Sequence, residues 1–220
     1  MIRRVLLAAI LAGIAAGLVM SVVQHWRVTP LILEAEAYET AHAHEEEEVE
    51  WQPADGVERT AFTVLFNVLT GIAFAFIAAA AALITRLPLN PTTGLMWGLA
   101  GFATFMLAPS AGLPPELPGM ATGDLASAQV WWWLAVAATA GGIGLIALTR
   151  HLAWKGAAIA LIALPHVIGP PHGDGTSAVP AGLANAFAAN AIAASAVFWM
   201  VLGVSLGYLL TRQADTREAP

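Results

Sequence analysis

Six apolar segments dominate the sequence and limit what the chain can fold into. They cover residues 5–26, 61–84, 94–112, 130–149, 152–169 and 187–210. The longer ones contain the roughly 20 residues that an α-helix needs to cross about 30 Å of hydrocarbon. Only 11% of the residues are charged, against about 25% in soluble domains. We therefore expect an all-α integral membrane protein, with residues 1–220 forming a single transmembrane domain.

The fifth segment decides between a bundle of five spans and one of six. It is the shortest of the six and contains Lys155, Pro165 and His166. If all six cross, only Arg27 and Arg59 lie on one side, and the other side holds Arg3, Arg4, Arg86, Arg150, Lys155, Arg212 and Arg217. Basic residues favour the cytoplasmic side of a membrane. We therefore predict six spans in a bacterial inner membrane, with both termini and a tail at 211–220 in the cytoplasm.

The segment at 27–60, between the first two spans, is predicted to be an external loop. It carries ten acidic residues and two arginines, and His42 and His44 directly precede four glutamates. Such a field concentrates divalent cations within a Debye length of about 8 Å. Histidine adds nitrogen donors that hard cations do not need. We interpret His42 and His44 as part of a metal-collecting loop, and the alternative is a solvated spacer.

His166 is the histidine that the predicted topology places inside the membrane. It lies about 14 residues from the inner end of its span, or roughly 21 Å up at 1.5 Å per residue. A titratable ring at that depth is a functional candidate, and the alternative is a neutral histidine that is hydrogen-bonded within the protein. Pro165 cannot donate a helix hydrogen bond, so the carbonyl of Leu161 is left as an available acceptor.

A first metal site is predicted at the external end of the first span. His25 ends this span, and a helical reading of the segment after Pro30 places Glu34 and Glu36 close by on neighbouring faces. Imidazole and carboxylate ligands together suit Co²⁺, Ni²⁺ or Zn²⁺. We predict His25, Glu34 and His166 as the site, with Glu36 as a further contact. The alternative for His25 is a structural residue at the interface.

Small, polar and aromatic residues in the spans indicate how the helices pack. Glycines spaced four apart let helix backbones approach closely; the pairs are Gly13 and Gly17, Gly94 and Gly98, and Gly203 and Gly207. Trp131, Trp132 and Trp133 are predicted as anchors at the outer membrane interface. The groups expected to join helices or line a path are Asn67, Thr70, Met106 and Asn190.

Three runs of the sequence resemble a known family. They are "TPLILEAEAYE" at 29–39, "LAPSAGLPPELPGM" at 107–120 and "LPHVIGPP" at 164–171. With the sequence around them they resemble the CbtA family of proposed cobalt transporter subunits, usually described with five spans. The resemblance implies an integral membrane protein that serves cobalamin biosynthesis. It also implies a partner, a small single-span CbtB-like protein with a histidine-rich tail.

These observations favour uptake of a divalent metal, with cobalt first and nickel or zinc as alternatives. The protein is not expected to be an enzyme, because no carboxylate lies inside a span to act as a base, nor to hold a tightly bound cofactor. Lys155 follows Trp154 rather than glycine, so there is no phosphate-binding loop for ATP. The competing hypotheses are a non-transporting membrane anchor or metal-delivery subunit, and an intramembrane enzyme or haem carrier. The negative formal charge of −6 argues against a nucleic-acid partner.

Overall fold

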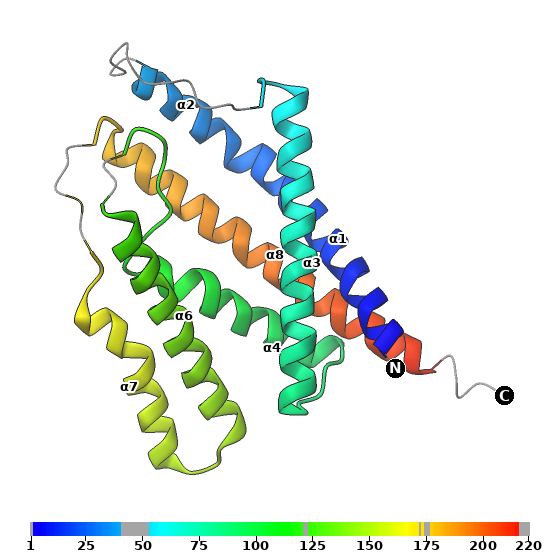
Figure 1. Cartoon of the computed structure of the whole chain (residues 1–220). Helices are drawn as coiled ribbons and strands as arrows, with labels where there is room; N and C mark the ends of the chain where they lie inside the picture. Colours follow the sequence, from blue (N-terminus) through cyan, green and yellow to red (C-terminus); the bar gives the residue numbers. More distant parts are fainter. Residues whose placement is uncertain (1, 41–52, 121–122, 172, 174–176, 216–220) are drawn as a thin grey trace. The chain divides into compact units, whose positions relative to one another are not determined.

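The computed structural model describes residues 2–40, 53–120, 123–171, 173 and 177–215, and all regular elements in these ranges are helical (Figure 1). In chain order they are α1 (Ile2–Arg27), α2 (Thr29–Thr40), α3 (Val57–Thr85), α4 (Pro91–Phe102), the π-helix η1 (Ala103–Leu107), α5 (Ala108–Ser110), α6 (Leu125–Leu148), α7 (Leu152–Ile168) and α8 (Ala181–Asp215). The predicted all-α fold is confirmed.

Each of the six predicted spans is helical. Among the described residues, four helices, α1, α3, α6 and α8, are long and apolar enough to cross a membrane. The third predicted span consists of α4, η1 and α5 in direct succession. The fifth is α7, whose 17 residues reach about 25 Å at 1.5 Å per residue. Apolar helices of this length form a membrane protein, and the number of six spans stays a prediction.

The chain divides into two compact units. Unit 1 consists of Met1–Arg27, Glu46–Gly101 and Ala193–Pro220, and unit 2 of Val28–Glu45 and Phe102–Ile192. Unit 1 therefore contains α1, α3, most of α4 and the later part of α8. Unit 2 contains α2, η1, α5, α6, α7 and the beginning of α8.

In unit 1, α1 packs against α3, which runs in the opposite direction. The contact is close because glycine puts no side chain between the two backbones. A Cβ atom on Gly17 would lie 2.5 Å from the Cα of Val68, and one on Gly13 would overlap the backbone of Ile72. The predicted close approach at Gly13 and Gly17 is confirmed, and any larger residue there must push the helices apart.

Glycines also join α4 to the later part of α8 in unit 1. A Cβ atom on Gly203 would lie 2.7 Å from the backbone nitrogen of Gly98 and would overlap the carbonyl oxygen of Gly94. Gly207 faces the backbone of Asn90 in the same way. The two predicted glycine pairs therefore pack against each other, one pair on each helix.

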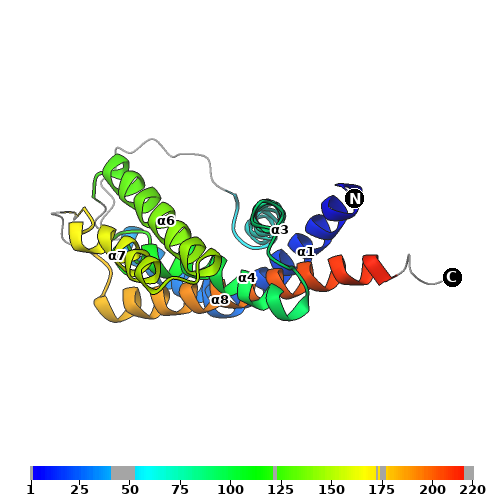
Figure 2. The same cartoon turned by 90° about the horizontal axis from the view of Figure 1, so that it is seen from below.

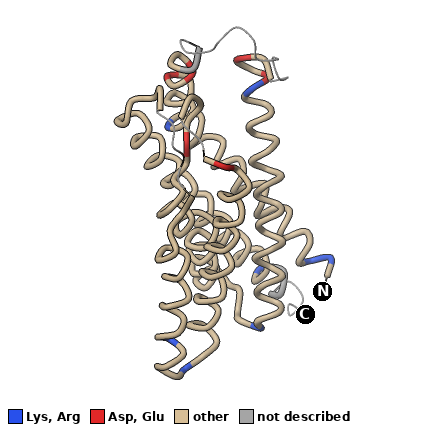
Figure 3. Tube along the Cα trace, turned by 60° about the vertical axis from the view of Figure 1, so that its left-hand side comes forward, with Lys and Arg blue, Asp and Glu red and all other residues tan. Residues whose placement is uncertain are grey.

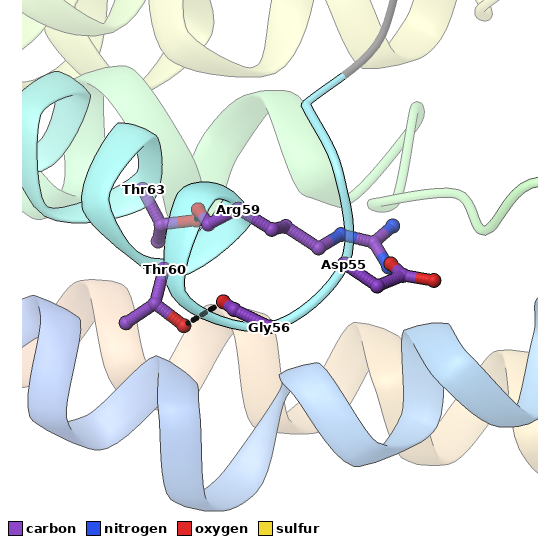
Figure 4. A network of polar contacts seen from close by, with 5 residues as sticks. All are labelled: Asp55, Gly56, Arg59, Thr60 and Thr63. Atoms are coloured by element: carbon purple, nitrogen blue, oxygen red, sulfur yellow. Dashed lines mark hydrogen bonds and ion pairs between the residues drawn. The ribbon is translucent and has the colours of Figure 1, made fainter.

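The start of α3 is held by contacts within the last part of the predicted external loop (Figure 4). Arg59 donates to the carboxylate of Asp55 at 3.1 Å, and the Thr60 hydroxyl donates to the Gly56 carbonyl at 2.8 Å. Gly56 has a φ of 91°, which glycine adopts without the strain of a side chain. The chain therefore turns into α3 at Gly56.

In unit 2, α6 and α7 form a helical hairpin (Figures 1 and 2). Asp124 caps the start of α6 by accepting from the Ser127 backbone at 2.8 Å and the Ser127 hydroxyl at 2.6 Å. Further along α6, a Cβ atom on Gly142 would lie 2.9 Å from the Ala158 carbonyl oxygen of α7. Glycine again permits the close approach, and the hairpin aligns the end of α7 with the beginning of α6.

Candidate functional site

The end of α7 is packed against α6 through one buried tryptophan. The Trp131 indole N–H donates to the carbonyl oxygen of Pro165 at 3.1 Å, and Trp131 is only 5% exposed. The centroid of its ring lies 5.6 Å from that of His166, at an interplanar angle of 71°. The other edge of the indole meets Gly112, where a Cβ atom would overlap the ring. Trp131 thus fills the space between α7 and the segment after α5.

This arrangement positions His166 in a defined way. The His166 side chain is half-buried, and its neighbour Pro165 is fully buried. Because the Pro165 carbonyl accepts from both the Trp131 indole and the Gly169 backbone at 3.0 Å, the backbone beside His166 is held from two directions. A partly accessible imidazole on a fixed backbone can accept a metal ion or a proton.

The prediction that all three tryptophans of α6 anchor the membrane interface is wrong for Trp131. Trp133 is 62% exposed, whereas Trp131 is buried. Successive helix residues are about 100° apart, so three in a row point in different directions. Trp131 faces α7, and Trp132 lies against Phe105 of η1 with ring centroids 6.4 Å apart.

His25 lies at the end of α1 in unit 1, and its side chain is exposed. The preceding residue, Gln24, takes part in a polar group between α1 and α3. The side-chain amide of Asn67 donates to Gln24 at 2.6 Å and to the Ser21 hydroxyl at 3.1 Å. The interpretation of Asn67 as a helix-joining residue is confirmed, and the backbone that carries His25 is therefore tied to α3.

Glu34 and Glu36 lie on α2 in unit 2. The predicted helical reading of this segment is confirmed, with Pro30 in the first turn. Glu34 is exposed and Glu36 is half-buried. Residues two apart on a helix differ by about 200° in direction, so the two carboxylates do not share a face of α2. His42 and His44 lie outside the described residues.

The predicted ligands are thus distributed over both units, His25 in unit 1 and Glu34, Glu36 and His166 in unit 2. Within the described residues, no three His, Asp or Glu side chains gather into a group that could hold a metal ion. The ligand assignment therefore stays a prediction. The remaining polar groups named from the sequence are mostly satisfied locally. Ser110 donates to the Met106 sulfur at 3.6 Å, and Asn190 to the Ala186 carbonyl at 2.7 Å, while Thr70 is exposed.

Charge is unevenly distributed in each unit (Figure 3). In unit 2, Arg150 and Lys155 lie at the connection between α6 and α7, whereas Asp124 caps the opposite end of α6. In unit 1, Arg86 ends α3, and Asp55 and Glu58 lie at its start. Unit 2 therefore has a basic end and an acidic one, whereas in unit 1 Arg27 and Arg59 balance the two described carboxylates near the start of α3.

The chain was also compared with known proteins. A family model described as "CbtA: Probable cobalt transporter subunit" matches residues 2–211. The chain belongs to the CbtA family. No curated protein and no solved structure gave a match.

CbtA membership confirms the resemblance seen in the sequence, and the match runs from α1 to α8. The family is one of transporter subunits, and a subunit acts in a complex. The family description names cobalt as the transported ion, and the apolar helices agree with a membrane location.

One polar residue of this CbtA chain was missed in the sequence. Thr139, in α6, is 3% exposed, and its hydroxyl has no hydrogen-bond partner among the described residues. Threonine inside an apolar helix usually donates to the carbonyl four residues back, so nothing in the sequence distinguished this one.

Proposed function

We propose that this CbtA family chain moves Co²⁺ inward across a bacterial inner membrane and supplies it to cobalamin biosynthesis. Cobalt is the transported substrate, and nickel or zinc is the alternative that the same ligands could carry. Both termini face the cytoplasm. A small single-span, histidine-rich CbtB-like protein is the partner subunit.

The observation that carries this proposal is the position of His166. It lies at the outer end of α7 in the predicted topology, half-buried, beside Pro165 and the buried Trp131. An ionisable residue within a transmembrane segment is energetically costly unless it faces protein or water, so its presence there points to a function. The family description supplies the ion that such an imidazole would bind.

Metal first meets the acidic external segment. Its carboxylates raise the local concentration of divalent cations, and His42 and His44 add nitrogen donors. His25 of α1 and Glu34 of α2 are the predicted ligands that the ion meets next, with Glu36 as a further contact, and His166 passes it into the bundle. The basic ends of both units are the cytoplasmic ends, in agreement with the preference of Lys and Arg for that side.

The membrane potential is sufficient to drive this uptake. Moving two charges through about 100 mV is worth roughly 4.6 kcal/mol. That corresponds to about three orders of magnitude in accumulation, since each 1.4 kcal/mol is a factor of ten. No site for ATP is required in this chain.

The test is a multi-element measurement of metals in cells that express the chain with and without its partner, using the double variant His25→Ala and His166→Ala. We expect cobalt to rise with the native chain and to fall about tenfold or more in the variant, as for other perturbed metal sites. His151→Ala is the matched control, because His151 is exposed and lies at the opposite end of α7. Unchanged cobalt in the double variant, with the protein still in the membrane, would remove these histidines from the pathway.

The alternative function is a membrane anchor or metal-delivery subunit that moves nothing by itself. The word "subunit" in the family description favours it. Measuring Co²⁺ inside sealed vesicles that contain the purified chain distinguishes the two functions. A transporter releases Co²⁺ into the vesicle interior, whereas an anchor only binds it on the outside.

A further inference from the structure

The hydroxyl of Thr139 is unusual within this protein. Thr139 is 3% exposed, and within the described part of the chain its Oγ1 is the one fully buried side-chain nitrogen or oxygen without a hydrogen-bond partner. Other hydroxyls in the helices donate to the carbonyl four residues back: Ser21 to Gly17, Thr63 to Arg59, Thr85 to Ala81, Thr149 to Leu145 and Thr211 to Gly207. The Thr139 hydroxyl is therefore free for another partner.

The depth of Thr139 suits a contact in the middle of the membrane. It lies nine residues before the end of α6 at Leu148, or about 14 Å at 1.5 Å per residue. That is close to half of a hydrocarbon layer of about 30 Å. Thr139 lies about 12 Å further along α6 than Trp131, which contacts His166.

Thr139 also lies on a particular face of α6. Trp132, Val136 and Thr139 are three and four residues apart, so they share a face. This face carries the ring contact between Trp132 and Phe105 of η1. Trp131, Ala135, Thr139 and Gly142 are also three and four residues apart, and α6 packs against α7 through Trp131 and Gly142. Thr139 therefore lies where the face toward η1 meets the face toward α7.

The π-helix adds a second, independent observation. π-helical turns occur frequently at functional sites, and irregular backbone at membrane depth is tolerated where it is buried in protein or lines a water-filled cavity. Thr104 of η1 is a buried polar residue. Met106 of η1 offers a thioether, with Ser110 of α5 donating to its sulfur. The segment that packs against α6 therefore carries hydroxyl and thioether groups.

We propose that the Thr139 hydroxyl is a contact for the transported divalent cation at mid-membrane, on the side of α6 between the π-helix and α7. The hydroxyl oxygen can bind the ion or its hydration shell, since it has two acceptor positions. A single hydroxyl gives a weak, exchangeable contact, as conduction requires. This assignment rests on the proposed uptake function and adds a second binding position for the ion along the pathway, after His166.

The test compares Thr139→Val, which keeps the shape and removes the hydroxyl, with Thr139→Ser, which keeps the hydroxyl. The initial rate of ⁵⁷Co²⁺ uptake is measured in cells with the full chain and its partner, and thermal unfolding is measured on the purified protein. Thr149→Val, at the residue that follows the last one of α6, is the matched control, because its hydroxyl is already bonded to the Leu145 carbonyl at 2.7 Å.

We expect Thr139→Val to lower the uptake rate about tenfold, which corresponds to roughly 1.4 kcal/mol. Its unfolding temperature should not fall, because removing an unpartnered buried hydroxyl is neutral or stabilising. Thr139→Ser and Thr149→Val should keep native uptake. Native uptake by Thr139→Val would overturn the assignment. So would a drop in unfolding temperature with the loss of uptake, since the hydroxyl would then bind only a structural water.

Failure of the proposed function has a different signature. If cells with the native chain accumulate no ⁵⁷Co²⁺, the uptake function fails for all variants alike. Thr139 is then judged by the rise in unfolding temperature that Co²⁺ produces in the purified chain. If Co²⁺ raises the unfolding temperature of Thr139→Val by less than that of Thr139→Ser, the contact between the hydroxyl and the ion is supported. Equal rises in the two variants would overturn it.

Discussion

Trp131→Phe tests whether the buried indole holds the end of α7. The substitution removes the hydrogen bond of 3.1 Å to the Pro165 carbonyl. That carbonyl keeps the Gly169 N–H at 3.0 Å, so it is not left unsatisfied, and the loss is about 1 kcal/mol. The smaller ring also leaves space beside Gly112, which it now fills, at a cost of roughly 1 kcal/mol. We expect the free energy of unfolding to fall by about 2 kcal/mol.

The assay is denaturant unfolding in mixed micelles, followed by circular dichroism because the substitution changes tryptophan fluorescence. Trp133→Phe is the matched control. It lies two residues away and is 62% exposed, so its effect should stay within about 0.5 kcal/mol. Equal effects of the two substitutions would refute the reasoning, because burial and the hydrogen bond would then contribute nothing.

Three further predictions concern helix packing and capping. Asn67→Leu should lower the free energy of unfolding by about 1 kcal/mol in the same assay, since it removes two interhelical hydrogen bonds; no change would mean that they are not formed in the membrane. Gly203→Ala should lower it by about 1–3 kcal/mol, because the new Cβ meets the α4 backbone, while Gly182→Ala, which meets nothing within 4 Å, should be harmless. The pKa of Asp124 is held below its usual value of 3.8 by the Ser127 hydroxyl and backbone N–H. The cap formed by Asp124 therefore stabilises α6 above pH 3.8, and this stabilisation is lost as pH falls through the lower pKa of the folded state. Hydrogen exchange in the first turn of α6 should be faster in Asp124→Ala than in the native chain at neutral pH, and the two rates should become equal in strong acid.

The length and place of the helices could be read from the sequence. All six apolar runs are helical, and the segment with Glu34 is a helix as its pattern indicated. The glycine pairs also predicted close helix contacts correctly. These features depend on local composition and spacing, which hydropathy and the helical repeat describe directly.

Only part of the candidate site could be predicted from the sequence. His166 stood out because a titratable ring within an apolar run is rare. Its contact with Trp131 could not be predicted, because three consecutive tryptophans look equivalent in the sequence. Only the packing of a neighbouring helix determines which of them is buried. The free hydroxyl of Thr139 and the π-helical turn at η1 likewise gave no signal in the composition.

Apolar run lengths and the charges between them were thus enough to establish a helical membrane protein, since each helix satisfies its own backbone in lipid. Which tryptophan is buried, which carbonyl receives its N–H, and which hydroxyl is left without a partner depended on contacts between different helices. Those outcomes follow from which side chains meet when helices pack, and only the tertiary structure decides that.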